Sequence, residues 1–228
     1  AQGKHKGKQP PDRLRQRVQT YFDPLPFYYA PLEEQATDTQ RFPLNAVTQR
    51  PMAMYHSWDS QNAWLRQIHS HNYLHVNPRT AQAAGIADGG WAWVESQWGQ
   101  VRCMLRYSEA VEPGTVWTWN AIGKADGAWQ LAPGADEARK GFLLNHLISE
   151  ELPMQGTASG RISNSDPITG QAGWYDVRVR IRPAEPEEPQ ETFPQIASMP
   201  AVPGVLGKAA QVLTYFAGKN TKAGGKKS

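Results

Sequence analysis

The stretch from Leu44 to Leu65, LNAVTQRPMAMYHSWDSQNAWL, decides how the rest of this 228-residue chain is interpreted. Residues 42–47 alternate apolar and polar side chains, as a half-buried β-strand does. Pro51 has no backbone donor and ends any continuing ladder, so the strand is predicted to stop near Arg50. A short strand that leads into a polar loop indicates one wall of a binding site.

The loop itself is crowded with hydrogen-bonding side chains, namely His56, Ser57, Asp59, Ser60, Gln61 and Asn62. Their spacing is not that of metal ligands, whereas Arg50 adds a planar guanidinium group that suits phosphate or carboxylate. We therefore expect an anion with heterocyclic groups as the ligand. The alternative is an ordinary solvated loop that caps a barrel strand.

Composition and charge limit the class of protein. The chain is 39% hydrophobic, which suffices for one core with extensions, and Cys103 is its single cysteine. One thiol cannot build a disulfide framework or ligate an iron–sulfur cluster, so Cys103 is expected to pack in the core. Residues 1–20 and 208–228 hold 11 of the 24 basic residues and one of the 21 acidic residues, which leaves an acidic central body and argues against nucleic-acid binding.

The middle of the chain is rich in β-forming residues separated by glycine-containing turns. Strands are predicted at 91–96, 101–107, 115–119 and 175–181, and helices at 79–84 and 136–148. These elements indicate a small barrel or sandwich with helices. The nine tryptophans fit such a core and its interfaces, or a carbohydrate platform.

Three further segments leave alternatives open. His69, His71 and His75 could share one strand face and bind a transition metal, or lie in a loop that leads into a barrel strand. Residues 183–203 are rich in proline and glutamate and are predicted to leave the domain surface as a linker. Residues 204–228 combine an amphipathic helix with a basic tail, which would dock on a partner, lie on a membrane or fold back on the domain.

A series of motifs occurs in one order along residues 40–182. Thr48-Gln49-Arg50 ends the first strand and Tyr55-His56-Ser57 follows in the loop. Later come Asn-Pro at 77–78, AQAAGIADGGWAWVES, Val-Glu-Pro-Gly-Thr-Val at 111–116, Asn145 in LLNHL, SDPITG at 165–170, and Trp174-Tyr175 before the last strand. This order resembles the C-terminal molybdopterin dinucleotide-binding domain of the dimethyl sulfoxide reductase family of molybdenum oxidoreductases. Gln49 and Asp176 stand where that family often has Gly and Lys.

The resemblance implies a mainly β fold, a six-stranded double-psi β-barrel with peripheral helices. It divides the chain into an N-terminal extension at 1–39, the cofactor-binding domain at 40–182, the linker at 183–203 and the helix with basic tail at 204–228. It also implies a set of cofactor-binding residues: Thr48, Gln49, Arg50, Pro51, Met52, Tyr55, His56, Ser57, Asn145 and Tyr175. No residue of this chain is assigned a catalytic or metal-binding role.

The same resemblance implies a function. The chain is expected to be the C-terminal part of a catalytic subunit that binds molybdopterin guanine dinucleotide (bis-MGD) with molybdenum, and not to be catalytic alone. The nearest branch is that of sulfite dehydrogenase and polysulfide or thiosulfate reductase, with sulfite oxidation preferred. The implied partners are upstream domains with an iron–sulfur cluster, an iron–sulfur electron-transfer subunit, and a membrane anchor subunit, all at the cytoplasmic face of the inner membrane. The alternative is a stand-alone β-rich module whose basic tails bind a polymer or protein.

Overall fold

A computed structural model describes most of the central part of the chain. The described residues are 11–22, 25–28, 30–56, 58, 59, 62–120, 122, 141–153, 161–166, 168–172, 176–185 and 188.

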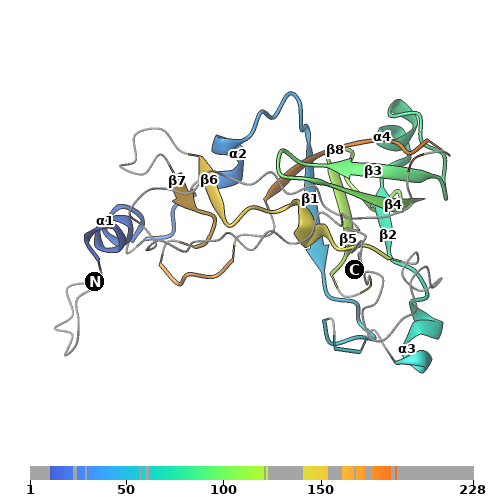
Figure 1. Ribbon diagram of the computed structural model, residues 1–228, viewed down its shortest axis with the longest axis horizontal. Coiled ribbons are helices and arrows are strands. Elements are labelled where there is room, and N and C mark those ends of the chain that lie inside the picture. The colour runs from blue at the N-terminus through green and yellow to red at the C-terminus, as the bar shows by residue number, and fades with distance from the viewer. Residues whose placement is uncertain are drawn as a thin grey trace, which may run out of the picture.

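Six strands close into a barrel in the order β1–β5–β2–β4–β3–β8 (Figure 1). They are β1 (Leu44–Gln49), β2 (Tyr73–Val76), β3 (Trp91–Glu95), β4 (Gln100–Tyr107), β5 (Thr115–Trp119) and β8 (Val177–Pro183). The pairs β1–β5 and β2–β4 are parallel and the other four pairs are antiparallel. The prediction of a mainly β, six-stranded barrel is confirmed.

The barrel core forms because successive strand side chains point to opposite faces. The inward residues Ala46, Leu74, Leu105 and Val116 are all fully buried. Cys103 belongs to the same cluster, and burial raises the pKa of its thiol, so the prediction that it packs in the core is confirmed.

The two ends of the barrel differ in chemistry. We call the end at which β1, β3 and β5 finish and β2, β4 and β8 begin the exit end. Here the inward positions become polar, with Thr48, Thr118 and Asn72 all buried. At the opposite end, α4 (Pro78–Ala83) covers the barrel after the cap residue Asn77.

Asn77 joins two segments of the opposite end. Its Oδ1 accepts a hydrogen bond from Arg79 N at 3.0 Å, and its Nδ2 donates to Val111 O at 2.8 Å. Gly85 and Gly89 have positive φ angles of 72° and 74° in the turns that follow α4. Glycine adopts this left-handed conformation without steric cost, so the turns close without strain.

A smaller group of elements lies beside the barrel. It consists of α1 (Asp12–Tyr21), α2 (Leu32–Ala36) and the two-stranded sheet of β6 (Glu151–Pro153) and β7 (Arg161–Ser163). Figure 1 shows α1, β6 and β7 on the left, away from the barrel. Arg17 donates to Ser163 O at 3.0 Å and so ties α1 to β7. No described helix is both long and apolar enough to cross a bilayer.

The helix predicted at 136–148 is not found in its described part, residues 141–148. That part contains only the 3₁₀ turn η2 (Leu144–Leu147), and residues 136–140 lie outside the described ones. Phe142, Leu144 and Leu147 are buried in the barrel core, and Phe142 O accepts from Asn72 while Leu147 O accepts from Ser96. The segment therefore crosses the exit end and uses its backbone to bind the barrel.

The first residues of the linker predicted at 183–203 lie on the barrel. Pro183 still belongs to β8, and the Glu188 carboxylate accepts from Trp93 Nε1 at 2.8 Å and from Arg182 at 3.0 Å. Residues 183 and 188 of the predicted linker thus still contact the barrel. The remainder of the linker and the predicted helix at 204–228 lie outside the described residues.

Candidate functional site

The segment between β1 and β2, residues 50–72, leaves the barrel at the exit end; we call it the excursion. It contains α3 (Ala63–Ile68), which begins because Asn62 Oδ1 accepts from Trp64 N at 3.0 Å and from Leu65 N at 3.4 Å. Figure 1 shows α3 beyond the barrel end to which the arrowhead of β1 points. The elements of the predicted binding loop therefore stand at one end of the barrel.

Local contacts shape the excursion near residues 54–59. Tyr55 N donates to Asp59 Oδ2 at 2.8 Å, and Trp58 N donates to Tyr55 O at 3.1 Å. Met54 is buried and packs with Ile122. His56 has a φ of 50°, which a residue with a Cβ adopts at a cost of about 1–2 kcal/mol.

The end of β5 brings Asn120 beside the excursion. Because β1 and β5 are parallel neighbours, their carboxyl ends meet, and Asn120 N donates to Gln49 O at 3.0 Å. The Asn120 side-chain nitrogen lies 3.4 Å from His56 Nδ1. The site is thus formed by two segments that are about 65 residues apart in the sequence.

Three buried oxygen atoms at this end have no hydrogen-bond partner within the described part of the chain. Thr48 Oγ1 and Asn120 Oδ1 lie where β1 and β5 finish, and Glu33 Oε2 lies beside the β3–β4 hairpin. An unsatisfied buried polar atom costs about 1–3 kcal/mol, so native proteins rarely retain one without a use. The Thr48 hydroxyl can donate or accept, the Asn120 amide oxygen accepts, and Arg50, exposed at the same end of the barrel, supplies a positive charge. This set fits an anionic ligand whose heterocycle carries donors and acceptors.

The structure brings together most of the predicted site residues. Gln49, Arg50 and His56 are exposed at the exit end, and the Arg50 guanidinium carbon lies 5.9 Å from the centre of the Tyr55 ring. Asn145 is exposed on η2, at the same end.

The other four predicted site residues are two that directly follow Arg50 and two that the structure does not describe. Pro51 is buried, whereas the Met52 side chain is 93% exposed. Ser57 and Tyr175 lie outside the described residues.

Sequence reasoning missed Asn120 and Asn72. Asn72 is fully bonded: its Nδ2 donates to Trp119 O at 2.9 Å, and its Oδ1 accepts from Thr118 Oγ1 at 2.8 Å. It therefore holds the ends of β2 and β5 together. The only signal for Asn120 was that it directly follows a predicted strand, and this becomes informative once β1 and β5 are known to be parallel.

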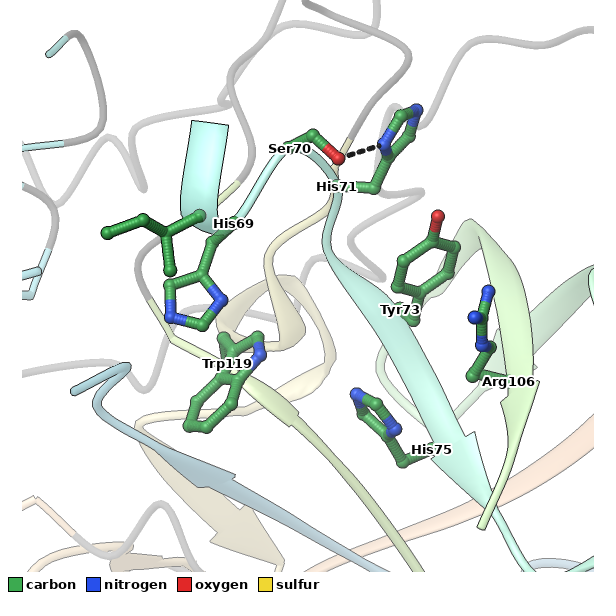
Figure 2. Close-up of a pocket in the computed structure, with 8 residues that line it drawn as sticks. His69, Ser70, His71, Tyr73, His75, Arg106 and Trp119 are labelled. Atoms are coloured by element: carbon green, nitrogen blue, oxygen red, sulfur yellow. Dashed lines mark hydrogen bonds between the residues drawn. The ribbon is translucent and has the colours of Figure 1, made fainter. Parts of the chain in front are cut away.

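A pocket of about 320 Å³ lies outside the barrel wall at the exit end (Figure 2). The segment between α3 and β2, the strand β2, Arg106 of β4 and Trp119 of β5 line it. Figure 2 shows His69 against Trp119, and Tyr73 beside Arg106.

The three histidines for which a metal site was one of two alternatives are engaged with aromatic rings. His75 is stacked on Trp117 with ring centres 4.0 Å apart, His71 is stacked on Tyr73 at 5.6 Å, and His69 lies 5.5 Å from Trp119. Burial, with a smaller contribution from Arg106, lowers the pKa of His75. Among the described residues no group of three histidine, cysteine or acidic side chains could hold a metal ion.

The sequence of this chain is similar to those of known proteins. The family model described as "Molydopterin dinucleotide binding domain" matches residues 44–160. One sulfite dehydrogenase subunit from Allochromatium vinosum is 69% identical over 218 residues, which is 96% of this chain and 22% of that protein. Acetylene hydratase from Syntrophotalea acetylenica is 30% identical over 99 residues, 42% of this chain and 14% of that protein. The chain therefore spans about a fifth or less of these curated relatives.

A solved structure shares the fold. Acetylene hydratase from Pelobacter acetylenicus superposes with a TM-score of 0.52 at 21% sequence identity, over 73% of this chain and 22% of that one. The resemblance read from the ordered motifs is confirmed by the family match, which covers just over half of the chain. The chain belongs to the molybdopterin dinucleotide-binding domain family.

Proposed function

We propose that this chain is the C-terminal domain of a molybdenum oxidoreductase and that its exit end binds molybdopterin guanine dinucleotide. The observation that supports this proposal best is that two buried oxygens, Thr48 Oγ1 and Asn120 Oδ1, have no partner within the described residues, at the end of the barrel that also exposes the cationic Arg50. The 69% identity to a sulfite dehydrogenase subunit supports sulfite as the substrate.

Each residue has a role that follows from its chemistry. Arg50 is exposed at the loop start and can place two donors on a phosphate. His56 and Asn120, whose side-chain nitrogens lie 3.4 Å apart, provide a donor and acceptor surface for a heterocycle. Thr48 lies at the barrel mouth and orients whichever polar group enters it.

When bound, the cofactor supplies the molybdenum at which oxygen-atom and two-electron transfer take place. This chain contributes binding and orientation. It holds the loop of residues 50–56 against the ends of β1 and β5, so that the donors are in place before the ligand arrives. The Asn72 hydrogen bonds tie the start of β2 to the end of β5.

The wider setting belongs to the same proposal and rests on the resemblance. The longer subunit would carry an iron–sulfur cluster outside this chain and lie at the cytoplasmic face of the inner membrane. It would work with two partners, an iron–sulfur subunit for electron transfer and a membrane anchor subunit. Fractionation of cells that express the longer subunit tests this setting. Recovery of the subunit from the periplasm would contradict the proposed location.

The cofactor proposal is tested in the longer subunit that contains this chain. Arg50→Ala, Asn120→Ala and Asn145→Ala should each lower the bound molybdenum and pterin per protein, because each removes a polar contact from the exit end. Arg79→Ala, an exposed arginine at the opposite end, is the matched control and should retain full content. Unchanged molybdenum and pterin in all three variants would overturn the site assignment.

The nucleotide and the substrate are tested in the same preparation. Acid hydrolysis followed by mass spectrometry should release guanosine monophosphate, and a different nucleotide would contradict the guanine form. The purified subunit should reduce an artificial electron acceptor when sulfite is added. If it holds the cofactor but does not respond to sulfite, the domain assignment stands and the substrate is wrong.

A further inference from the structure

The outer side of the barrel carries a row of three paired side chains. Trp93 of β3 lies directly opposite Arg102 of β4 on one side and Arg182 of β8 on the other. Directly paired residues of neighbouring antiparallel strands project from the same face of a sheet. That face is the outer one, because Ala92 and Val94, on either side of Trp93, belong to the core. We call Trp93, Arg102 and Arg182 the arginine wall.

The arginine wall is separate from the candidate cofactor site. In the closed order of the strands, β3 and β5 are three places apart in either direction, so they stand across the barrel from each other. Asn120 follows β5, whereas the arginine wall is centred on β3. A ligand on this wall therefore needs none of the cofactor-binding residues of the exit end.

The carboxylate of Glu188 already occupies the arginine wall. Its Oε2 accepts from Trp93 Nε1 at 2.8 Å and from Glu185 N at 2.7 Å, and its Oε1 accepts from Arg182 at 3.0 Å. The backbone oxygen of Glu188 accepts from Arg102 at 3.3 Å. The hydrogen bond from Glu185 N is the largest cause that lowers the pKa of Glu188, so this carboxylate is charged at neutral pH. One glutamate thus contacts every member of the wall.

Positive charge remains in excess on this side of the barrel. Arg180 and Arg182 share a single carboxylate, that of Glu95, at 2.6 and 2.8 Å. Arg102 is only 3% exposed, forms no ion pair with any described acid, and has no hydrogen-bond partner for its Nε. Its guanidinium carbon instead lies 5.0 Å from the centre of the Trp91 ring. A buried guanidinium without a carboxylate is unfavourable, so Arg102 favours a ligand that brings a further acid.

Glu188 belongs to a segment with the composition of a peptide ligand. The sequence PAEPEEPQE at residues 183–191 contains four glutamates and three prolines. Proline-containing segments are commonly bound by other proteins in an extended form. Beyond β8, Ala184 N donates to Trp91 O at 3.0 Å, and the Glu188 side chain keeps 27% of its surface in contact with water. Among the described residues, the segment is therefore attached by a few solvent-accessible polar contacts.

We propose that the arginine wall is a binding site for an acidic, proline-containing peptide of a partner protein, and that Glu188 occupies it as an intramolecular competitor. Charge complementarity selects an acidic ligand, and a peptide with a second carboxylate gains a contact at Arg102 that the Glu188 side chain does not make. A tethered competitor has a high effective concentration, so only a partner that makes more contacts displaces it. The wall is thereby closed to weak acidic ligands.

Peptide binding tests the proposal. The probe is a fluorescein-labelled peptide with the sequence of residues 183–191, and fluorescence anisotropy measures its affinity for the 228-residue chain and for the longer subunit. In both proteins, Glu188→Ala should bind the peptide about tenfold more tightly than the parent, because the competitor is removed. Glu185→Gln, which changes an exposed acid of the same segment, should bind like the parent. Equal affinity of the parent and Glu188→Ala would overturn the proposal.

Two arginines of β4 locate the bound peptide. In the Glu188→Ala background, Arg102→Gln should weaken peptide binding by about tenfold, since it removes the charge that the peptide reaches. Arg106→Gln, at an exposed position further along the strand, is the matched control and should retain binding. Unchanged binding in Arg102→Gln would contradict the site.

The Trp93 indole gives a readout that does not depend on the folding of Arg102→Gln. In the Glu188→Ala chain, the NMR signal of the Trp93 indole N–H, assigned with Trp93→Phe, should move when the unlabelled peptide is added. An indole signal that does not move would overturn the proposal.

Competition tests the chemical class of the ligand. Unlabelled peptide should displace the probe from Glu188→Ala, and a peptide that carries Glu188→Gln should need about ten times the concentration. Sodium sulfate should displace no more probe than sodium chloride of the same ionic strength. Displacement by sulfate as complete as that by the peptide would mean that the wall binds any anion. Dimerisation of the parent chain that Glu188→Ala abolishes would mean that a second copy supplies the segment. Either result overturns the proposed partner.

Discussion

The exit end and the opposite end of the barrel are built from the same six strands but follow different rules. At the opposite end, Asn77 is fully bonded and glycines occupy the left-handed turns. At the exit end, a histidine takes a left-handed φ, and buried oxygens of Thr48, Asn120 and Glu33 have no partner in the described part of the chain. The difference teaches that local rules are satisfied where the barrel only needs to close and are broken at the end that we propose binds the cofactor.

The largest expected effect is a difference in the free energy of unfolding between variants of Asn77 and Asn145. Asn77→Ala removes a helix cap and leaves Val111 O unsatisfied, so the free energy of unfolding of the 228-residue chain should fall by about 3 kcal/mol. Asn145→Ala, at an exposed position of the exit end, should leave it unchanged. Urea unfolding measures both, with the exposed Gln82→Ala as the control on α4. Equal losses of unfolding free energy in Asn77→Ala and Asn145→Ala would contradict the proposed difference between the two ends of the barrel.

The next effect concerns the left-handed positions. Gly89→Ala should lower the free energy of unfolding by about 1 kcal/mol through backbone strain alone, because an added Cβ meets no atom within 4 Å. His56→Gly should raise it by up to about 1 kcal/mol, since glycine relieves the strain at φ 50°. Thermal unfolding of the two variants measures these shifts. A loss of stability in His56→Gly would show that the histidine side chain stabilises the loop.

Glu33 should make the stability of the exit end depend on pH. It is buried beside the β3–β4 hairpin at the exit end, where Oε1 accepts from Trp98 Nε1 at 3.0 Å and from Thr37 Oγ1 at 3.1 Å. Burial raises the pKa of Glu33 above its ordinary value of 4.5, and Asp176 raises it further.

The sign of the pH effect follows from that shift. The folded chain binds the Glu33 proton more tightly than the unfolded chain, so stability falls as pH rises above 4.5 toward the raised pKa. Glu33→Gln should therefore be more stable than the parent at neutral pH, and the gain should vanish below pH 4.5. Urea unfolding at a series of pH values measures it. A variant that is less stable at neutral pH would contradict the assignment.

The smallest effect on stability is expected at Thr48. Thr48→Val replaces a hydroxyl that has no described partner, so the free energy of unfolding should stay constant or rise by up to about 1 kcal/mol. In the longer subunit the same change should lower the pterin content. Thr118→Val is the contrasting control: it removes the bond to Asn72, and its stability should fall. Normal pterin in Thr48→Val would show that this hydroxyl does not contact the cofactor.

Local patterns in the sequence were sufficient for β1, β3, β4, β5 and β8, whereas β2 was left open and β6 and β7 were not predicted. β5 has the predicted bounds of 115–119, and β1 ends at Gln49, next to the Arg50 predicted from Pro51. Period-two alternation and the position of a proline depend on only a few neighbouring residues, so they predict strand positions without knowledge of the tertiary fold. The closed six-stranded barrel was predicted from the resemblance of the ordered motifs. The alternation of the strands alone indicated only a small barrel or sandwich.

The same reasoning predicted only some of the residues of the candidate site. Arg50 and His56 stand in one loop, so their proximity could be read from the sequence. Asn120 could not be found in this way, because it reaches the loop through the parallel pairing of β1 with β5. The segment at 141–148 was misread because its apolar residues fill the end of the barrel, and a helical pattern cannot be told from such a plug by periodicity.

The last strand has a consequence for how this chain folds. β8 pairs with β1 at Val179–Leu44 and with β3 at Ile181–Val94, so the barrel closes only when the chain has been made as far as residue 183. Until then β1 and β3 present unpaired strand edges, which attract other chains. Pairing across about 135 residues also makes closure slow. On the ribosome, the time between synthesis of β5 and of β8 is therefore when this protein is most exposed to aggregation and most dependent on chaperones.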